Sequence, residues 1–415
     1  MPADRDAFRA PVGTHDVLPP DSEQWIEVIA RFADRAARFG YGLIVTPVFE
    51  HREVFERAGV ATDVVRKEMY DFEDKGGRAV ALRPEGTAPV VRAFVQHRPP
   101  VPWKTWYLAP NLRYERPQRG RYRQHWQLGA EAIGVSDPEV DIEVIDLAHG
   151  FYRDVGASVT LLLNSMGDEQ SRPAYVAVLR EYLLEHGGGL GPEFRERVEQ
   201  SPLRVLDAKR DDWQEVIERA PQLTEYLSDE AQEHFERVQL GLDAIGIDYE
   251  LAPRLVRGFD YYTSTTFEFA SDALDAAQNA VGGGGRYDRL SEEMGGPPAP
   301  GIGFGIGIER VLLAMGSSDG PTRRIDVFVV GGPDPMLVHE LRESGLATDE
   351  AFGDRSWKAQ LKAADRAGAA FAVLLGAHER ARGAVAVKRL ESAEQVEVPR
   401  EQLVGWLQAE LERAS

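Results

Sequence analysis

Residues 301–310 read Gly-Ile-Gly-Phe-Gly-Ile-Gly-Ile-Glu-Arg, with glycine at every second position. Side chains of a β-strand alternate between two faces, so one face is bare backbone and the other carries Ile302, Phe304, Ile306 and Ile308. Repeated glycine weakens a strand and usually marks close approach by a ligand or another backbone, and a bare face can lie flat against a planar ring. A bulged or buried structural strand is the alternative. A dinucleotide fingerprint is excluded, because the G-x-G-x-x-G spacing is not met.

The composition bounds the class of protein. With 415 residues and 43% hydrophobic content, the chain predicts two or three domains with well-formed cores. The net charge of -20 means that any polyanionic partner must be met by local basic patches. The absence of cysteine excludes disulfides, thiolate zinc sites and cysteine nucleophiles. We find no apolar leader and no run of about 18 apolar residues, and therefore expect a cytoplasmic protein.

The order of the predicted elements indicates an α+β core. A helix is predicted from about Asp21, and strands are predicted at 43–50, 79–82, 105–108 and 123–133. Strands this close in sequence favour an antiparallel sheet flanked by helices. The charged, helix-forming segment 171–249 reads as a helical insertion, and a helix at 311–315 ends the core.

A second domain is predicted after a Gly- and Ser-rich linker at 316–324. Strands at 326–330, 371–375 and 384–387 alternate with helices near 336–343, from Ser356 and near Arg400, which is typical of a small α/β domain. We therefore expect one domain over 1–320, including the insertion 171–249, and another over 321–415.

An arginine cluster indicates an anionic ligand. Residues 113–123 contain five arginines and one acid in a strongly acidic chain. Arginine suits phosphate because its planar fork donates two hydrogen bonds and stays charged. A solvated hairpin tip is the alternative.

The strand after this cluster places Gln127 and Glu131 on one face with Gly129 between them, while Trp126, Leu128 and Ala130 face the core. The pattern predicts a hollow between two polar groups, in which Glu131 accepts a hydrogen bond from an imidazole or ammonium nitrogen. A solvent-facing polar stripe is the alternative.

A turn at Arg83-Pro84-Glu85-Gly86-Thr87 offers a carboxylate and a hydroxyl, a plausible cradle for an α-amino group. Alternatively, Glu85 starts the following helix, since acids cluster at helix N-termini.

Taken together, these segments resemble the histidyl-tRNA synthetases, a class II aminoacyl-tRNA synthetase family. The class motifs correspond to 41–50, 113–131 and 301–310, and the resemblance runs from about Gly13 to the C-terminus. More specific are Arg257-Gly-Phe-Asp-Tyr-Tyr262 and Gly282-Gly-Gly-Gly-Arg-Tyr-Asp288, which are similar to segments that mark the histidine enzyme among its relatives.

The resemblance implies an ATP-dependent histidine–tRNA ligase that uses Mg²⁺. It implies that Glu85, Thr87 and Gln127 hold the α-amino end of histidine, that Glu131, Tyr262 and Tyr287 read its imidazole, and that Arg257 and Tyr261 also line its site. It implies that ATP is bound by Arg113, Glu115, Arg121 and Arg310. Arg113 and Arg257 would be the catalytic residues, and no metal ligand is assigned.

The resemblance also implies tRNA(His) as a partner, a homodimer formed through the first class motif, and an anticodon-binding role for 321–415. The candidate tRNA contacts are Arg116, Gln118, Arg123, Lys358 and Lys362. Lys358, Lys362 and Arg366 share one helix face, which suits phosphates, although an ordinary solvated face is the alternative.

Some residues depart from the family pattern. Trp357 and Arg289 stand where leucine and glycine are usual, and the segment between Val330 and Arg355 is short. The rival functions are a non-catalytic regulatory subunit of ATP phosphoribosyltransferase and a sensor of uncharged tRNA. We expect retention of Arg113, Arg257 and Arg310 to favour the ligase.

Overall fold

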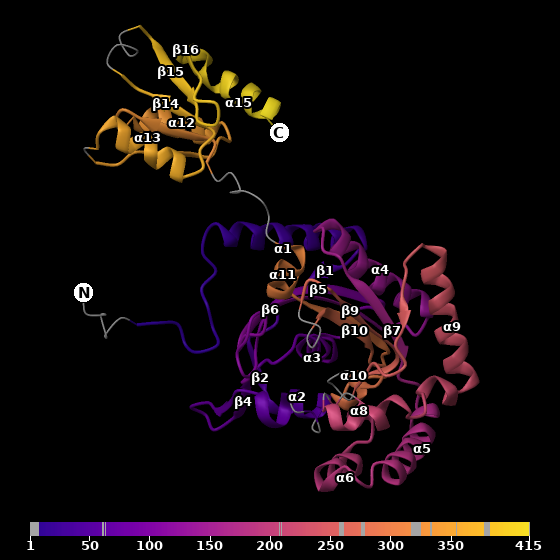
Figure 1. Ribbon diagram of the computed structural model, residues 1–415. Helices are drawn as coiled ribbons and strands as arrows, with labels where there is room; N and C mark the ends of the chain where they lie inside the picture. Colours follow the sequence, from indigo (N-terminus) through magenta and orange to yellow (C-terminus); the bar gives the residue numbers. More distant parts are fainter. Residues whose placement is uncertain are drawn as a thin grey trace. The chain divides into compact units, whose positions relative to one another are not determined.

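The computed structural model describes residues 8–59, 62, 64–206, 208, 210–256, 261–274, 279–316, 325–332, 334–353, 355–376 and 382–414. The chain divides into two compact units, Met1–Ser317 and Ser318–Ser415. Figure 1 shows the elements of both units.

The first unit is built on a sheet whose strand order, among the described residues, is β1-β5-β6-β11-β10-β9-β7-β8 (Figure 1). The strands are β1 (Gly42–Leu43), β5 (Trp103–Leu112), β6 (Gln124–Ile133), β7 (Thr160–Ser165), β8 (Glu250–Leu251), β9 (Thr263–Ala270), β10 (Ala280–Arg286) and β11 (Gly301–Gly307). Neighbouring strands from β5 to β7 are antiparallel, whereas β1 and β8 join the two edges in parallel. The predicted antiparallel core is confirmed.

The strand predicted at 43–50 is wrong as a continuous element. β1 ends at Leu43, and the next strand, β2 (Phe49–His51), belongs to a separate small sheet with β4 (Ala79–Leu82) and β3 (Asp71–Glu73). Pro47 lies between the two strands and has no N–H to donate to a ladder. The chain therefore changes sheets within the predicted strand.

One face of the large sheet packs against α1 (Asp21–Arg38), α4 (Pro138–Asp154), α9 (Asp229–Ala244) and α11 (Ile308–Met315). Its core includes Phe32, which makes edge contacts with Phe151 and Phe304 at centroid distances of 5.1 and 6.1 Å. Ile302, Phe304 and Ile306 are buried here. The apolar face predicted for the glycine-rich strand is therefore core, although Ile308 already belongs to α11.

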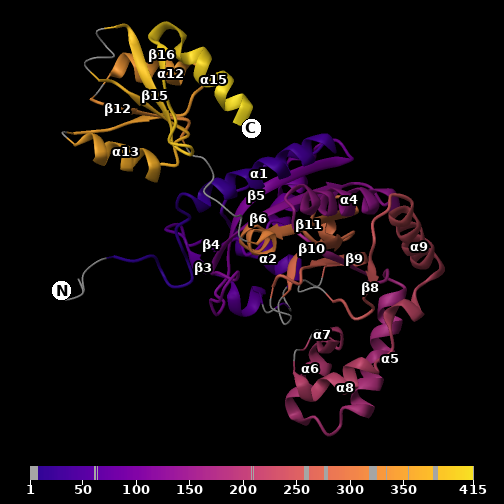
Figure 2. The same ribbon diagram turned by 45° about the horizontal axis from the view of Figure 1, so that its top comes forward.

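The opposite face carries shorter helices and the helical insertion. The elements are α2 (Arg52–Gly59), η1 (Val64–Glu68), α3 (Thr87–His97), α10 (Leu290–Glu293), α5 (Ser171–His186), α6 (Gly191–Gln200), α7 (Leu203–Leu206), α8 (Asp211–Glu218) and η2 (Leu223–Tyr226). Figure 2 shows α5 to α8 gathered in one cluster, while α9, which also follows Ser171, runs beside α4. The predicted insertion therefore reaches both faces of the sheet.

The second unit is a small α/β fold, as expected. Its sheet has the order β13 (Thr348–Glu350), β12 (Val327–Val330), β14 (Phe371–Leu374), β15 (Ala384–Arg389) and β16 (Gln395–Pro399). The helices are α12 (Pro335–Glu343), α13 (Trp357–Arg366), η4 (Arg400–Gln402) and α15 (Leu403–Ala414). β13 and β16 were not predicted. Across both units, no helix in the described ranges is long and apolar enough to cross a membrane.

Candidate active site

A cavity of about 210 Å³ lies on the α3 side of the central sheet, and we call it the inner cavity. Its walls are Val64, Glu85, Thr87, Arg113, Gln127, Tyr261, Tyr262, Gly283, Phe304 and Gly305. It brings together most of the residues predicted to bind a small polar substrate, although the first and last of them, Glu85 and Tyr262, are 177 positions apart in the chain. The order of the strands explains this convergence, because β6, β11 and β10 are neighbours.

Glu131 lies fully buried beside this cavity, with 0% of its surface exposed. Thr87 Oγ1 donates to Glu131 Oε1 at 2.7 Å, Tyr107 Oη donates to the same oxygen at 3.4 Å, and Tyr287 Oη donates to Oε2 at 2.6 Å. Burial raises the pKa of Glu131 to about 8, although the hydroxyl donors oppose the shift. The alternative prediction, a solvent-facing polar stripe, is therefore wrong for Glu131.

The glycines of β11 make room for the side chains of the neighbouring strand. A Cβ at Gly303 would overlap the carboxylate of Glu131, and a Cβ at Gly305 would overlap the amide of Gln127. Close approach was predicted, and here it comes from side chains of the protein itself. The hollow predicted at Gly129 is wrong in one respect, because the ring of Tyr107 occupies the place of a Cβ there.

Glu85 starts a helix and also lines the inner cavity. Its Oε2 accepts from the Thr87 backbone N–H at 2.6 Å and its Oε1 from that of Ala88 at 2.8 Å, so the carboxylate caps α3. Burial raises its pKa, and these N–H donors oppose the shift. The two readings of this turn are therefore compatible.

A second cavity of about 360 Å³, the arginine cavity, adjoins the first through a shared residue. Its walls are Arg113, Glu115, Gly120, Arg121, Tyr122, His125, Glu268, Ala280, Gly307, Glu309 and Arg310. The arginines and the acid predicted to bind ATP all lie here. Arg113 lines both cavities, and its Nε donates to the carbonyl oxygen of Pro84 at 2.8 Å.

Burial shifts the pKa values of two groups that line the arginine cavity. Burial, with Arg113 and Arg121 nearby, lowers the pKa of His125 to about 3, so its ring is neutral at physiological pH. Burial also raises the pKa of Glu309 to about 7, and this carboxylate accepts from the Trp126 backbone N–H at 2.9 Å. Glu115 forms an ion pair with Arg121. The cavity therefore presents guanidinium groups around a neutral aromatic ring, as a phosphate-bearing ligand with a planar base would require.

Sequence reasoning missed several residues of the site. Tyr107 contacts Glu131, and Asn111 Nδ2 donates to Gln127 Oε1 at 2.6 Å. Strand alternation indicates that Tyr107 and Asn111 share one face of β5, but their contacts with Glu131 and Gln127 follow only from the register between β5 and β6. His125, Glu268 and Glu309 were also missed.

Other predicted residues are not brought into these cavities. Arg116 and Gln118 are exposed on the loop between β5 and β6, and Arg123 stacks 4.0 Å from the ring centre of Tyr114 at the base of that loop. Lys358 and Lys362 are exposed on α13 of the second unit. Arg257 lies outside the described residues. Within the described ranges, no group of three or more His, Cys, Asp and Glu side chains could hold a metal ion.

Comparison with known proteins gives matches to both units. A family model described as histidyl-tRNA synthetase matches residues 13–167 and 191–311, and an anticodon-binding domain model matches residues 335–410. A histidine–tRNA ligase of Rhodococcus erythropolis is 46% identical over 96% of this chain and 97% of the relative. That of Corynebacterium urealyticum is 47% identical over 97% of each chain. The solved structure of apo S. aureus histidyl-tRNA synthetase matches with a TM-score of 0.80 and 34% sequence identity. The match covers 97% of this chain and 100% of the S. aureus chain.

Proposed function

The chain belongs to the histidyl-tRNA synthetase family, and from this premise we propose how its two cavities carry out the reaction of a histidine–tRNA ligase. Histidine and ATP form histidyl-adenylate and pyrophosphate, and the histidyl group is then transferred to the 3′ end of tRNA(His). The observation that carries the proposal is the position of Arg113. It lines both cavities, where the carboxylate of one substrate would meet a phosphate of the other.

The inner cavity takes histidine in this proposal. Glu85, Thr87 and Gln127 hold the α-amino end, and Glu131, Tyr262 and Tyr287 read the imidazole, with Tyr261 completing the wall. The burial of Glu131 supports this assignment, because a desolvated carboxyl group favours a ligand whose nitrogen forms a hydrogen bond with it. The ring of Tyr261 packs against Tyr262 and Tyr287 at centroid distances of 4.8 and 5.9 Å, which gives the cavity a stiff aromatic side.

The arginine cavity takes ATP. Arg113 grips the α-phosphate, Arg121 and Glu115 lie along the nucleotide, and Arg310 holds the terminal phosphate and covers the adenine. Arg257 stabilises the charge that develops during attack. A histidine carboxylate oxygen attacks the α-phosphorus in line, and the bond to the bridging oxygen breaks as pyrophosphate leaves with the electron pair. The step needs no enzymic nucleophile, because positioning and neutralisation of charge suffice.

Mg²⁺ is expected to enter this cavity with ATP. Protein sites usually hold it by one or two carboxylates together with substrate phosphates, which fits a cavity lined by acids but without a cluster of three ligands among the described residues. Glu268 and Glu309 would hold the ion, which neutralises phosphate charge when bound.

We further propose tRNA(His) as the second-step partner and the cytoplasm as the site of action. The match of residues 335–410 to an anticodon-binding domain supports tRNA binding by the second unit. Arg116, Gln118 and Arg123 are the candidates for contact with the acceptor end, since their loop borders the arginine cavity.

A second copy of the chain is the proposed partner at the first class motif. The apolar side chains of Leu43, Val45 and Phe49 are 58, 81 and 52% exposed, and Ile26 of α1 is 67% exposed. Leu43, Val45 and Phe49 lie close together in the sequence, and clustered exposed apolar residues mark interaction surfaces. A homodimer would cover them.

The regulatory-subunit alternative is not favoured. The ligases that this chain resembles are matched over nearly their whole length, and the second unit matches an anticodon-binding domain. Arg113 and Arg310 also remain in the arginine cavity.

Amino-acid-dependent exchange of labelled pyrophosphate into ATP tests the function. We expect exchange with histidine and with no other of the twenty amino acids, and about a 100-fold or greater loss in Arg113→Ala and Arg257→Ala. Arg116→Ala is the matched control, because it should leave exchange unchanged and lower only the aminoacylation of tRNA. A folded, histidine-binding protein without exchange would support the regulatory or sensor function instead.

A further inference from the structure

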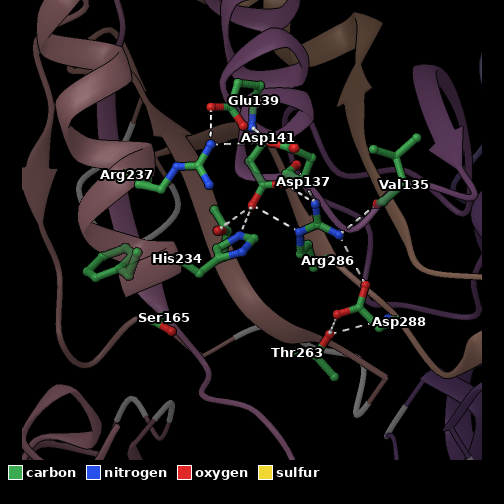
Figure 3. Close-up of polar contacts among 12 residues, drawn as sticks. Val135, Asp137, Glu139, Asp141, Ser165, His234, Arg237, Thr263, Arg286 and Asp288 are labelled. Atoms are coloured by element: carbon green, nitrogen blue, oxygen red, sulfur yellow. Dashed lines mark hydrogen bonds and ion pairs between the residues drawn. The ribbon is translucent and has the colours of Figure 1, made fainter. Parts of the chain in front are cut away.

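Arg286 and Asp141 form a buried ion pair behind the proposed histidine site. Arg286, the last residue of β10, is 1% exposed, and Asp141, in the first turn of α4, is 0% exposed. Arg286 Nε donates to Asp141 Oδ2 at 3.0 Å, and Nη2 lies 2.7 Å from Oδ1. Figure 3 shows the guanidinium also reaching the backbone oxygens of Val135 and Asp137, at 3.1 and 3.0 Å. A buried charge held by this many partners has one orientation.

This pair fixes both residues that flank Tyr287. Arg286 precedes Tyr287, and Asp288, which follows it, accepts from Arg286 Nη1 at 3.2 Å. Alternation along the chain turns Arg286 and Asp288 to one side and Tyr287 to the other, where its hydroxyl donates to Glu131 at 2.6 Å. Asp288 Oδ2 also accepts from Thr263 Oγ1 at 3.1 Å, and Thr263 follows Tyr262 of the inner cavity. Tyr287, the partner of Glu131 beside the cavity, and Tyr262, a wall of the cavity, are therefore both connected to the same pair.

A histidine from the insertion joins the pair. His234 of α9 has its Nε2 2.7 Å from Asp141 Oδ2 (Figure 3). Thr265 Oγ1 donates to the same oxygen at 2.6 Å. One turn further along α9, Arg237 forms ion pairs with Glu139 and, at 3.7 Å, with Asp137, but within the described residues it forms none with Asp141. Among the described residues of α9, His234 is the one whose side chain contacts Asp141 directly.

We propose that Arg286, Asp141 and His234 form a positioning hub through which the helical insertion sets the affinity of the inner cavity for histidine. The hub touches no substrate and acts by orienting Tyr287 and, through Asp288 and Thr263, the Tyr262 wall. The proposal rests on the proposed function, because Tyr287 matters here as the partner of Glu131 and Tyr262 as a wall of the histidine site. The arginine cavity shares no residue with the hub, so ATP binding is independent of it.

The test is pyrophosphate exchange by the full chain, with histidine and ATP varied separately. His234→Ala should raise KM for histidine about five- to tenfold and leave KM for ATP within about twofold, because one hydrogen bond to a buried carboxylate is lost. His234→Gln, which restores an N–H donor, should recover most of the affinity. Thr265→Val offers an independent route to the same result. Arg237→Ala is the matched control and should change neither KM.

Equal values for His234→Ala and Arg237→Ala would overturn the hub, as would a parallel rise of both KM values. A fall in Tm without a change in KM for histidine would make the hub merely structural and also overturn the proposal. Absence of histidine-dependent exchange in the unmodified protein is a different failure, since it removes the proposed function itself.

Discussion

At the scale of single residues, the site is defined by groups whose burial is costly. Glu131 is the clearest case, because burial raises its pKa to about 8 from an ordinary value of 4.5. Folding therefore favours the protonated carboxyl group. The resulting stability is present below pH 4.5 and is lost as the pH rises through about 8. A residue that destabilises the protein at high pH is expected to be retained for binding.

The substitution Glu131→Gln separates these two effects. The variant cannot ionise, so above pH 8 its free energy of unfolding should equal or exceed that of the unmodified protein. Its kcat/KM for histidine should fall about tenfold to 100-fold, because the amide cannot reproduce the acceptor pattern of a carboxylate. Urea unfolding at pH 6 and pH 9, together with pyrophosphate exchange, measures both. A variant that is less stable at pH 9 would contradict the assigned direction of the pKa shift.

Gly303 tests the reason for the glycine run. Gly303→Ala puts a methyl group into the carboxylate of Glu131, so kcat/KM for histidine should fall at least about tenfold, with about 1–3 kcal/mol of destabilisation. The control is Gly405→Ala in α15, where an added Cβ meets nothing within 4 Å. That variant should gain about 0.5–1 kcal/mol of stability and keep its kinetics. Unchanged histidine kinetics in Gly303→Ala would refute close packing as the cause.

At the scale of elements, alternation along β6 predicted which side chains reach the site and which face the core. Leu128 and Ala130 are buried against α1 and α4, while Gln127 and Glu131 lie on the α3 side. Strand alternation needs only local sequence, so it could be inferred. The contributions of Tyr107 and Asn111 depend on the register between β5 and β6, which no local pattern specifies. The break at Pro47 was missed because the apolar run continues on either side of it.

An ion pair of limited exposure joins α1 to α4, in addition to the apolar packing of Phe32 against Phe151. Asp154 accepts from Arg35 Nε at 2.6 Å and Nη2 at 2.8 Å, and these hydrogen bonds from Arg35 lower the pKa of Asp154 below its usual 3.8. The stabilisation is therefore present above pH 3.8 and is lost as the pH falls through the folded-state pKa. Asp154→Asn should cost about 2 kcal/mol at pH 7, and the difference should shrink in acid.

Urea unfolding at pH 7 and at successively lower pH checks this. The control Glu215→Gln disrupts an ion pair with Arg219 whose side chains are mostly exposed, and should have no measurable effect. A cost for Asp154→Asn that is independent of pH would show that the charge of Asp154 is not its source.

At the scale of the whole molecule, the net charge of -20 opposes binding of any polyanion, so tRNA must be met by local cations. The basic residues of α13 are the place that we propose. Lys358, Lys362 and Arg366 are exposed, and Ser356 caps the helix by accepting from the Ala359 N–H. The order of elements in this unit was predicted from their spacing. Its edge strands β13 and β16 were not, because β13 is three polar residues and β16 has only two apolar residues, Val396 and Val398, separated by an acid.

Lys362→Glu tests whether this stripe binds tRNA or is an ordinary solvated face. Reversing one charge near phosphates should raise KM for tRNA about threefold to tenfold at physiological salt. The slope of log KM against log salt concentration should also decrease by about one for each phosphate contact that is lost. Pyrophosphate exchange should be unchanged, because that step does not involve tRNA. Arg382→Glu is the control, since it makes the same change of charge in the same unit at a residue paired with Glu397. Equal effects of the two reversals on KM for tRNA would mean that tRNA binding depends only on the overall charge of the unit. The α13 stripe would then be an ordinary solvated face.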